Sequence, residues 1–174
     1  MATRGIDFAT LTLKDALDLA VLIEEEAKER YEEFTAQMEA HHTPEAASFF
    51  RFMVGNEAKH EAELAARRSM LFGNSPRTVS RAMIFDVEAP DYDEARAFMS
   101  PHTALDSAYR CETKAHGFFV AALPRIQDPD VRALFEELRD EEVEHQEMVQ
   151  AAMAKLPPES KVDPNDFADE PVSH

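Results

Sequence analysis

Two short motifs pair a carboxylate with an imidazole three residues downstream, and each pair could bind a metal ion. The pairs are Glu57 with His60, and Glu142 with His145. On a helix, side chains three residues apart lie on the same face, one turn from each other. Carboxylate oxygens and imidazole nitrogens together suit iron or manganese. The two pairs therefore predict a metal site to which two helices contribute.

Each pair lies within a stripe of apolar residues that alternates steps of three and four. This spacing is typical of helices that pack together in a bundle. Two further stripes have the same spacing, and each carries a single glutamate, Glu24 in one and Glu112 in the other. A buried charge without a partner is very costly, so these four stripes predict a bound cation that balances the carboxylates.

The chain is an internal repeat of a two-helix unit, in which a helix with one glutamate precedes a helix with a Glu-x-x-His motif. Superposing Glu57 on Glu142 aligns two helix-start signals, residues 43–44 and 128–129, each a capping side chain followed by proline. The two single-glutamate stripes superpose in the same way. A shared register of this kind predicts one architecture with two similar halves.

The helix-start and helix-stop signals predict an all-α fold of four long helices. The expected segments are a lead-in at 1–11, a four-helix bundle at 12–156 with a crossover at 73–100, and an acidic tail at 157–174. Short connections make neighbouring helices antiparallel, whereas the long crossover carries the chain back along the bundle. We therefore expect two antiparallel helix hairpins joined by that crossover.

The composition excludes several classes of partner. The 174 residues contain 18 basic and 35 acidic side chains, for a formal charge of −17. This charge argues against binding to nucleic acid or to an anionic membrane. No signal peptide or membrane span is visible, so we expect a cytoplasmic protein. The single cysteine, Cys111, allows neither an internal disulfide nor a thiolate zinc site, and we expect it to be half-buried.

The four glutamates lie at similar depths along the predicted bundle and should meet in one layer. A layer of four glutamates and two histidines matches the constellation of di-iron and di-manganese carboxylate bundles. Six ligands exceed what one tetrahedral ion takes, so two metal ions are implied. These donors suit iron or manganese, and zinc could take their place in the isolated protein.

This pattern resembles the di-iron domain of the rubrerythrin family, in the ferritin-like superfamily, over about residues 12–156. The matching motifs are Glu24-x-x-Ala27-x-x-x-Tyr31, Glu57-x-x-His60, Glu112-x-x-Ala115 and Glu142-x-x-His145. The resemblance implies that Glu57 and Glu142 bridge two irons. It also implies that the terminal ligands are Glu24, His60, Glu112 and His145.

The resemblance implies a non-haem di-iron oxidoreductase that reduces hydrogen peroxide or dioxygen. Full rubrerythrins append a rubredoxin domain, which this sequence lacks, so we expect a separate electron donor such as a rubredoxin or a reductase. Apolar residues outside the stripes favour a homodimer. Two alternatives stay open, an iron-handling protein with ferroxidase activity and a non-catalytic acidic helical interaction protein.

Polar residues near the stripes complete the set of expectations. Tyr31 could donate a hydrogen bond to a ligating carboxylate or could be a plain core residue. Asp18 and Asp106, at equivalent positions in the repeat, are expected to be solvated at the flanks. His116 should be exposed, and residues 41–42, both histidine, should form a solvated turn.

Overall fold

The chain folds into a bundle of four long helices, as the sequence predicts. The computed structural model describes residues 5–40, 44–84, 87 and 100–157, and within these ranges it contains helices and no strand. The elements are α1 (Leu13–Ala40), α2 (Pro44–Phe72), the 3-10 turn η1 (Arg81–Met83), α3 (Pro101–Ala122), the 3-10 turn η2 (Leu123–Arg125) and α4 (Pro129–Met153). None of the helices in the described ranges is long and apolar enough to cross a lipid bilayer.

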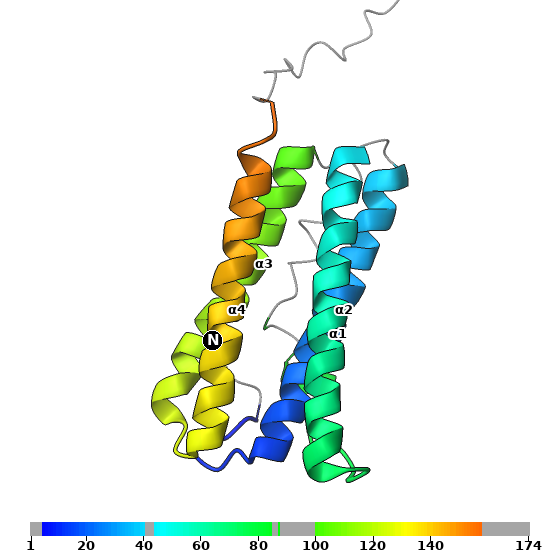
Figure 1. Cartoon of the computed structure of the whole chain (residues 1–174). Helices are drawn as coiled ribbons and strands as arrows, with labels where there is room; N and C mark the ends of the chain where they lie inside the picture. Colours follow the sequence, from blue (N-terminus) through cyan, green and yellow to red (C-terminus); the bar gives the residue numbers. More distant parts are fainter. Residues whose placement is uncertain (1–4, 41–43, 85–86, 88–99, 158–174) are drawn as a thin grey trace, which may run out of the picture.

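The helices form two hairpins, α1 with α2 and α3 with α4, which lie side by side (Figure 1). Helix α2 ends at the end of the bundle where α1 begins, whereas α3 begins at the opposite end (Figure 1). The connection at 73–100 therefore joins opposite ends of the bundle, as predicted, and α3 runs parallel to α2.

Local side-chain chemistry sets the helix ends. The Ser100 hydroxyl accepts a hydrogen bond from the Thr103 backbone N–H at 3.2 Å, and Pro101 occupies the first turn of α3. The Asp128 carboxylate caps α4 in the same way. Gly73 follows α2 with a φ of 55°, a left-handed conformation that glycine adopts without steric cost. The predicted cap at Thr43 and the 41–42 pair lie outside the described residues.

Two apolar clusters fill the bundle interior, one toward each end. The first cluster includes Leu17, Ile23 and Leu138, and the second includes Met53 and Val149. On every long helix, one buried glutamate separates the residues of the first cluster from those of the second. The interior therefore consists of two hydrophobic halves with a charged layer between them.

Two residues of the predicted lead-in contribute to the core. Ile6 and Phe8 are buried. The Phe8 ring packs edge-on against Phe118 and Phe135, with centroids 5.8 and 6.1 Å apart, and the Arg125 guanidinium lies over it at 5.0 Å. Phe8 thus covers the end of the α3–α4 hairpin near η2.

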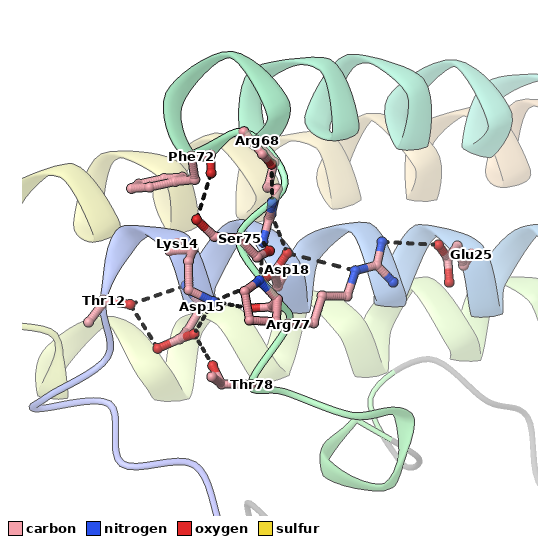
Figure 2. Close-up of polar contacts among 12 residues, drawn as sticks. Thr12, Lys14, Asp15, Asp18, Glu25, Arg68, Phe72, Ser75, Arg77 and Thr78 are labelled. Atoms are coloured by element: carbon pink, nitrogen blue, oxygen red, sulfur yellow. Dashed lines mark hydrogen bonds and ion pairs between the residues drawn. The ribbon is translucent and has the colours of Figure 1, made fainter.

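The expectation that Asp18 is solvated is wrong, because its side chain is fully buried. Arg68 Nε lies 2.7 Å from its carboxylate, Lys14 Nζ lies 3.2 Å from it, and Arg77 Nε lies 3.8 Å from it (Figure 2). Arg68 also donates hydrogen bonds to the backbone carbonyls of Gly73 and Ser75. We call Lys14, Asp18, Arg68 and Arg77 the Asp18 cluster; it joins α1, α2 and the start of the crossover.

Two further expectations about single residues need correction. Cys111 is fully buried, with 3% of its surface exposed, rather than half-buried. His116 is half-buried rather than exposed. Asp106 keeps a half-exposed side chain, as expected, and pairs with Arg110 at 3.1 Å. The two aspartates equivalent in the repeat therefore differ in their surroundings.

Candidate metal centre

The six residues predicted as ligands all contribute to the charged layer between the two apolar clusters. Their shared property is burial, which is nearly complete for five of them. The relative exposures are Glu24 4%, Glu57 1%, Glu112 0%, Glu142 4% and His145 3%. The His60 side chain is more open, at 17%. We refer to these six residues as the six-residue layer.

The donor atoms of this layer fall into groups in which all atoms lie within 4.8 Å of one another. Two of these groups have no residue in common, which is what two separate ions would require. One consists of Glu24, His60 and Glu141, and the other of Glu112, Glu142 and His145. A third group, Glu57 with His60 and His145, connects them.

The two imidazoles meet in the middle of the layer. The His60 and His145 rings stack with centroids 5.2 Å apart and an interplanar angle of 9°. His145 Nδ1 lies 3.3 Å from Glu112 Oε2 and 3.7 Å from Glu57 Oε1. His60 Nδ1 lies 3.9 Å from Glu24 Oε2. Carboxylates from three helices, α1, α2 and α3, thus surround histidines from α2 and α4.

Crowding and burial shift the protonation of these groups. Burial raises the pKa of Glu24 to about 7, although a hydrogen bond with Glu57 opposes the shift. Burial and the neighbouring His145 lower the pKa of His60. For His145, burial alone would lower the pKa, but the surrounding carboxylates, Glu112 first and then Glu24 and Glu141, raise it. In the absence of another cation, Glu24 and His145 therefore hold a proton more tightly than free side chains do, whereas His60 holds one less tightly.

The layer contains buried polar atoms that no protein group satisfies. Both ring nitrogens of His145, Nδ1 of His60 and Oε2 of Glu112 are buried without a hydrogen-bond partner among the described residues. Buried polar atoms almost always have a hydrogen-bond partner, and leaving such an atom without a hydrogen bond is costly. These are nitrogen and carboxylate donors of the kind that divalent iron or manganese accepts, so the residues present fit a metal site.

Tyr31 hydrogen-bonds to the layer and also packs in the core. Its side chain is buried, and its hydroxyl donates a hydrogen bond to Glu112 Oε1. The ring also stacks on Phe50, with centroids 5.9 Å apart. Tyr31 therefore fixes the orientation of one carboxylate of the layer while its ring packs in the core.

Among the described residues, Glu141 is the one member of these donor groups that the motifs did not include. It is half-buried, and burial raises the pKa of its carboxyl, with a further rise from Glu137. A signal was present in the sequence, because Glu141 and His145 are four residues apart and share a helix face. The Glu-x-x-His motif includes the adjacent Glu142 and therefore did not indicate Glu141.

A small cleft opens onto the layer beside His60. Its volume is about 90 Å³. The lining residues come from α2 and α4, and most are charged: His60, Glu63, Leu64, Arg67, Glu137 and Glu141. Arg67 Nη1 pairs with Glu137 Oε2 at 3.0 Å across this cleft. A volume of this size holds a few water molecules and connects one end of the layer to solvent.

Comparisons with known proteins agree with this geometry. The sequence model of a family described as Rubrerythrin matches residues 15–153. A crystal structure of an uncharacterised conserved protein from Magnetospirillum magnetotacticum MS-1 is similar, with a TM-score of 0.70 and 29% sequence identity. The match covers 86% of this chain and 99% of that chain. No curated protein matches the sequence.

Proposed function

The chain belongs to the rubrerythrin family of ferritin-like helical bundles, and from that premise we propose that it is a di-iron oxidoreductase acting on hydrogen peroxide or dioxygen. One observation carries the proposal. Four buried glutamates and two histidines meet in one layer that contains buried donor atoms without a protein partner. Burying several carboxylates in this way costs many kcal/mol unless cations balance them.

The two separate donor groups support an assignment of ligands to two ions. Glu24 and His60 would hold one ion, and Glu112 and His145 would hold the other. Glu57 and Glu142 would lie between them, which agrees with the short distance from Glu57 to His145. Two ferrous ions in this site would supply the two electrons that, with two protons, reduce one hydrogen peroxide to two water molecules.

The chain's own residues favour a small oxidant. The apolar clusters on both sides of the layer exclude bulk water, so the carboxylates keep their positions in a medium of low polarity. Tyr31 holds the Glu112 carboxylate by its hydrogen bond. The cleft beside His60 has room for peroxide or dioxygen and is too small for a large organic substrate. These features favour peroxide or dioxygen reduction over hydroxylation of an organic molecule.

Anaerobic titration with Fe(II), followed by rapid mixing with hydrogen peroxide or with dioxygen, tests the proposal. We expect about two irons per chain and rapid oxidation of the reduced protein by one of these oxidants. Glu57→Gln should lose iron binding, whereas Asp106→Asn, a half-exposed carboxylate away from the layer, should bind as the unchanged protein does. Failure of the unchanged protein to bind iron or to turn over with either oxidant would contradict the proposal.

An iron-handling role is the second candidate, and the acid-lined cleft beside His60 favours it because carboxylates attract cations. Assembly into a large hollow shell that holds many irons per chain would support this role over peroxide reduction. An acidic interaction protein without metal would show no bound iron or manganese, and Glu57→Ala would leave its stability unchanged or higher. The separate electron donor, the homodimer and the cytoplasmic setting stay predictions.

A further inference from the structure

The two ends of the six-residue layer are not equivalent. At one end, Glu112 Oε2 lies against His145, whose side chain is 4% exposed. At the other end, Glu24 faces His60, whose side chain is 17% exposed and lines the cleft. The second end therefore has a more open side, and Glu141 lies on that side.

Glu141 completes a compact donor group at the open end. One ligand atom from each of Glu24, His60 and Glu141 lies within 4.8 Å of the others. His60 Nδ1 in this group is buried without a hydrogen-bond partner, and the His145 ring that stacks on it has two such nitrogens. Because a buried imidazole nitrogen needs a partner, His60 Nδ1 points to a cation in this group rather than to a chance cluster of acids.

The internal repeat gives no such carboxylate to the other end. When Glu57 is superposed on Glu142, Asn56 occupies the position that corresponds to Glu141. The Asn56 amide donates a hydrogen bond to Met148 Sδ at 3.4 Å, so it is engaged away from the layer. Among the described residues, the donor groups thus contain an additional carboxylate at the open end and none at the other.

The neighbouring acids of the cleft differ from Glu141 in their contacts. Glu137 pairs with Arg67 at 3.0 Å, so a protein cation already balances its charge. Glu141 makes neither a hydrogen bond nor an ion pair with any residue in the described part of the chain. A half-buried carboxylate in that situation is costly unless a cation balances its charge.

We propose that Glu141 is a seventh metal-binding residue, which binds the ion at the Glu24–His60 end from the side of the cleft. The inference rests on the proposed function, since it assumes that the layer holds ions. It makes the two ion sites unequal: the Glu24–His60 ion gains a carboxylate that has no counterpart at the Glu112–His145 ion. The same side chain stands at the opening, where an ion exchanges with solvent.

Anaerobic calorimetric titration of the full chain with Fe(II), and visible spectra of the Co(II)-substituted protein, test this assignment. The unchanged protein should bind two ions. Glu141→Gln should lower the affinity for one of the two ions by about tenfold or more, because removing a group that supports a metal ligand already lowers metal affinity by this much. The Co(II) absorption should change as that ion loses an oxygen ligand. Glu141→Asp keeps a carboxylate on a shorter side chain, so its affinity for that ion should lie between those of the unchanged protein and Glu141→Gln.

Glu137→Gln is the matched control, because it removes an acid of the same cleft that already has a protein partner. It should bind both ions as the unchanged protein does. Suppose that the unchanged protein binds two ions and that Glu141→Gln binds them with the same affinity and the same spectrum. That result would overturn the role of Glu141 and leave the proposed function standing. An equal loss of affinity for both ions in Glu141→Gln would also overturn the role of Glu141. An unchanged protein that binds no metal would instead contradict the proposed function itself.

Discussion

The molecule buries carboxylates in two regions and balances them in two different ways. In the Asp18 cluster, a fully buried aspartate lies within 4 Å of three cationic side chains, Lys14, Arg68 and Arg77. In the six-residue layer, four glutamates are buried at the middle of the bundle. There, the contacts of Glu24 and Glu112 within the described residues come from histidines, Tyr31 and other acids, and not from lysine or arginine.

Position in the bundle explains the difference. Asp18 lies near the end of the bundle, where Arg68 and Arg77 approach from α2 and the start of the crossover (Figure 2). The six-residue layer lies between two apolar clusters, and its residues face one another. One region is therefore a permanent structural ion-pair cluster, whereas in the other Glu24 and Glu112 contact no lysine or arginine among the described residues. A buried acid without a protein counter-charge is thus the better indicator of a functional site.

Metal loading should have the largest effect and should act on the layer alone. At a free Fe(II) or Mn(II) concentration 1,000 times the dissociation constant, each occupied site should add about 4 kcal/mol to the free energy of unfolding. Anaerobic urea unfolding, with metal and with a chelator, measures this gain. Asp18→Asn should show the same metal-dependent gain, because the Asp18 cluster takes no part in binding. Equal stability with and without metal would remove the distinction between the two regions.

Breaking the Asp18 cluster should have the next largest effect. Arg68→Ala removes the closest cation from a buried carboxylate and two hydrogen bonds to crossover carbonyls, so it should lower the free energy of unfolding by about 3 kcal/mol. Urea unfolding of the metal-free protein measures the loss. Arg67→Ala, the adjacent arginine with the exposed partner Glu137, should cost less than about 1 kcal/mol. Similar losses in the two variants would mean that Asp18 does not depend on Arg68.

Changing the pH should affect the metal-free layer through Glu24. Burial raises its pKa from 4.5 to about 7, so the folded state binds the proton more tightly than the unfolded state does. The resulting stability is fully present below about pH 4.5 and is lost as the pH rises through about 7. The stability advantage of the unchanged protein over Glu24→Gln should therefore fall by roughly 2–3 kcal/mol between pH 5 and pH 8.

Comparing the unchanged protein with Glu24→Gln separates the pH-dependent stability that Glu24 contributes from that of the neighbouring histidines. The raised pKa of His145 acts in the same direction as that of Glu24, and the lowered pKa of His60 acts in the opposite direction. Both histidines are present in each protein, so their contributions largely cancel. Metal-loaded protein should lose the effect, because a bound ion favours the ionised carboxylate. A stability advantage that does not change with pH would show that Glu24 is ionised in the metal-free layer.

The smallest effect is expected from Tyr31→Phe. The change removes the hydroxyl that donates to Glu112 and leaves the ring stacked on Phe50, so it should cost about 1 kcal/mol in the metal-free protein. Tyr109→Phe is the control, because the Tyr109 hydroxyl makes no hydrogen bond in the described part of the chain. Thermal unfolding of both variants measures the difference. Equal midpoints would mean that the Tyr31 hydroxyl contributes nothing to holding the carboxylate.

The repeat shows how far the sequence can be read. Asp18 and Asp106 occupy equivalent positions, and the periodicity of the apolar stripes predicts that both are solvated at the flank of a helix. In the structure, the start of the crossover brings Arg77 to Asp18, and α2 brings Arg68, whereas Asp106 pairs with Arg110 on its own helix. The partners of Asp18 on α2 and the crossover are 50 residues or more away in the chain, and no local pattern encodes them.

The sequence by itself determined the helices, their ends and the six residues that face one another. Apolar spacing and capping residues act within a few residues of each position, so they can be read along the chain. Only the tertiary structure decided that Asp18 is buried, that Phe8 joins the core, and that Glu141 and a cleft lie beside His60. Those features depend on which segments pack against each other across the bundle, and that packing is settled by contacts between distant parts of the chain.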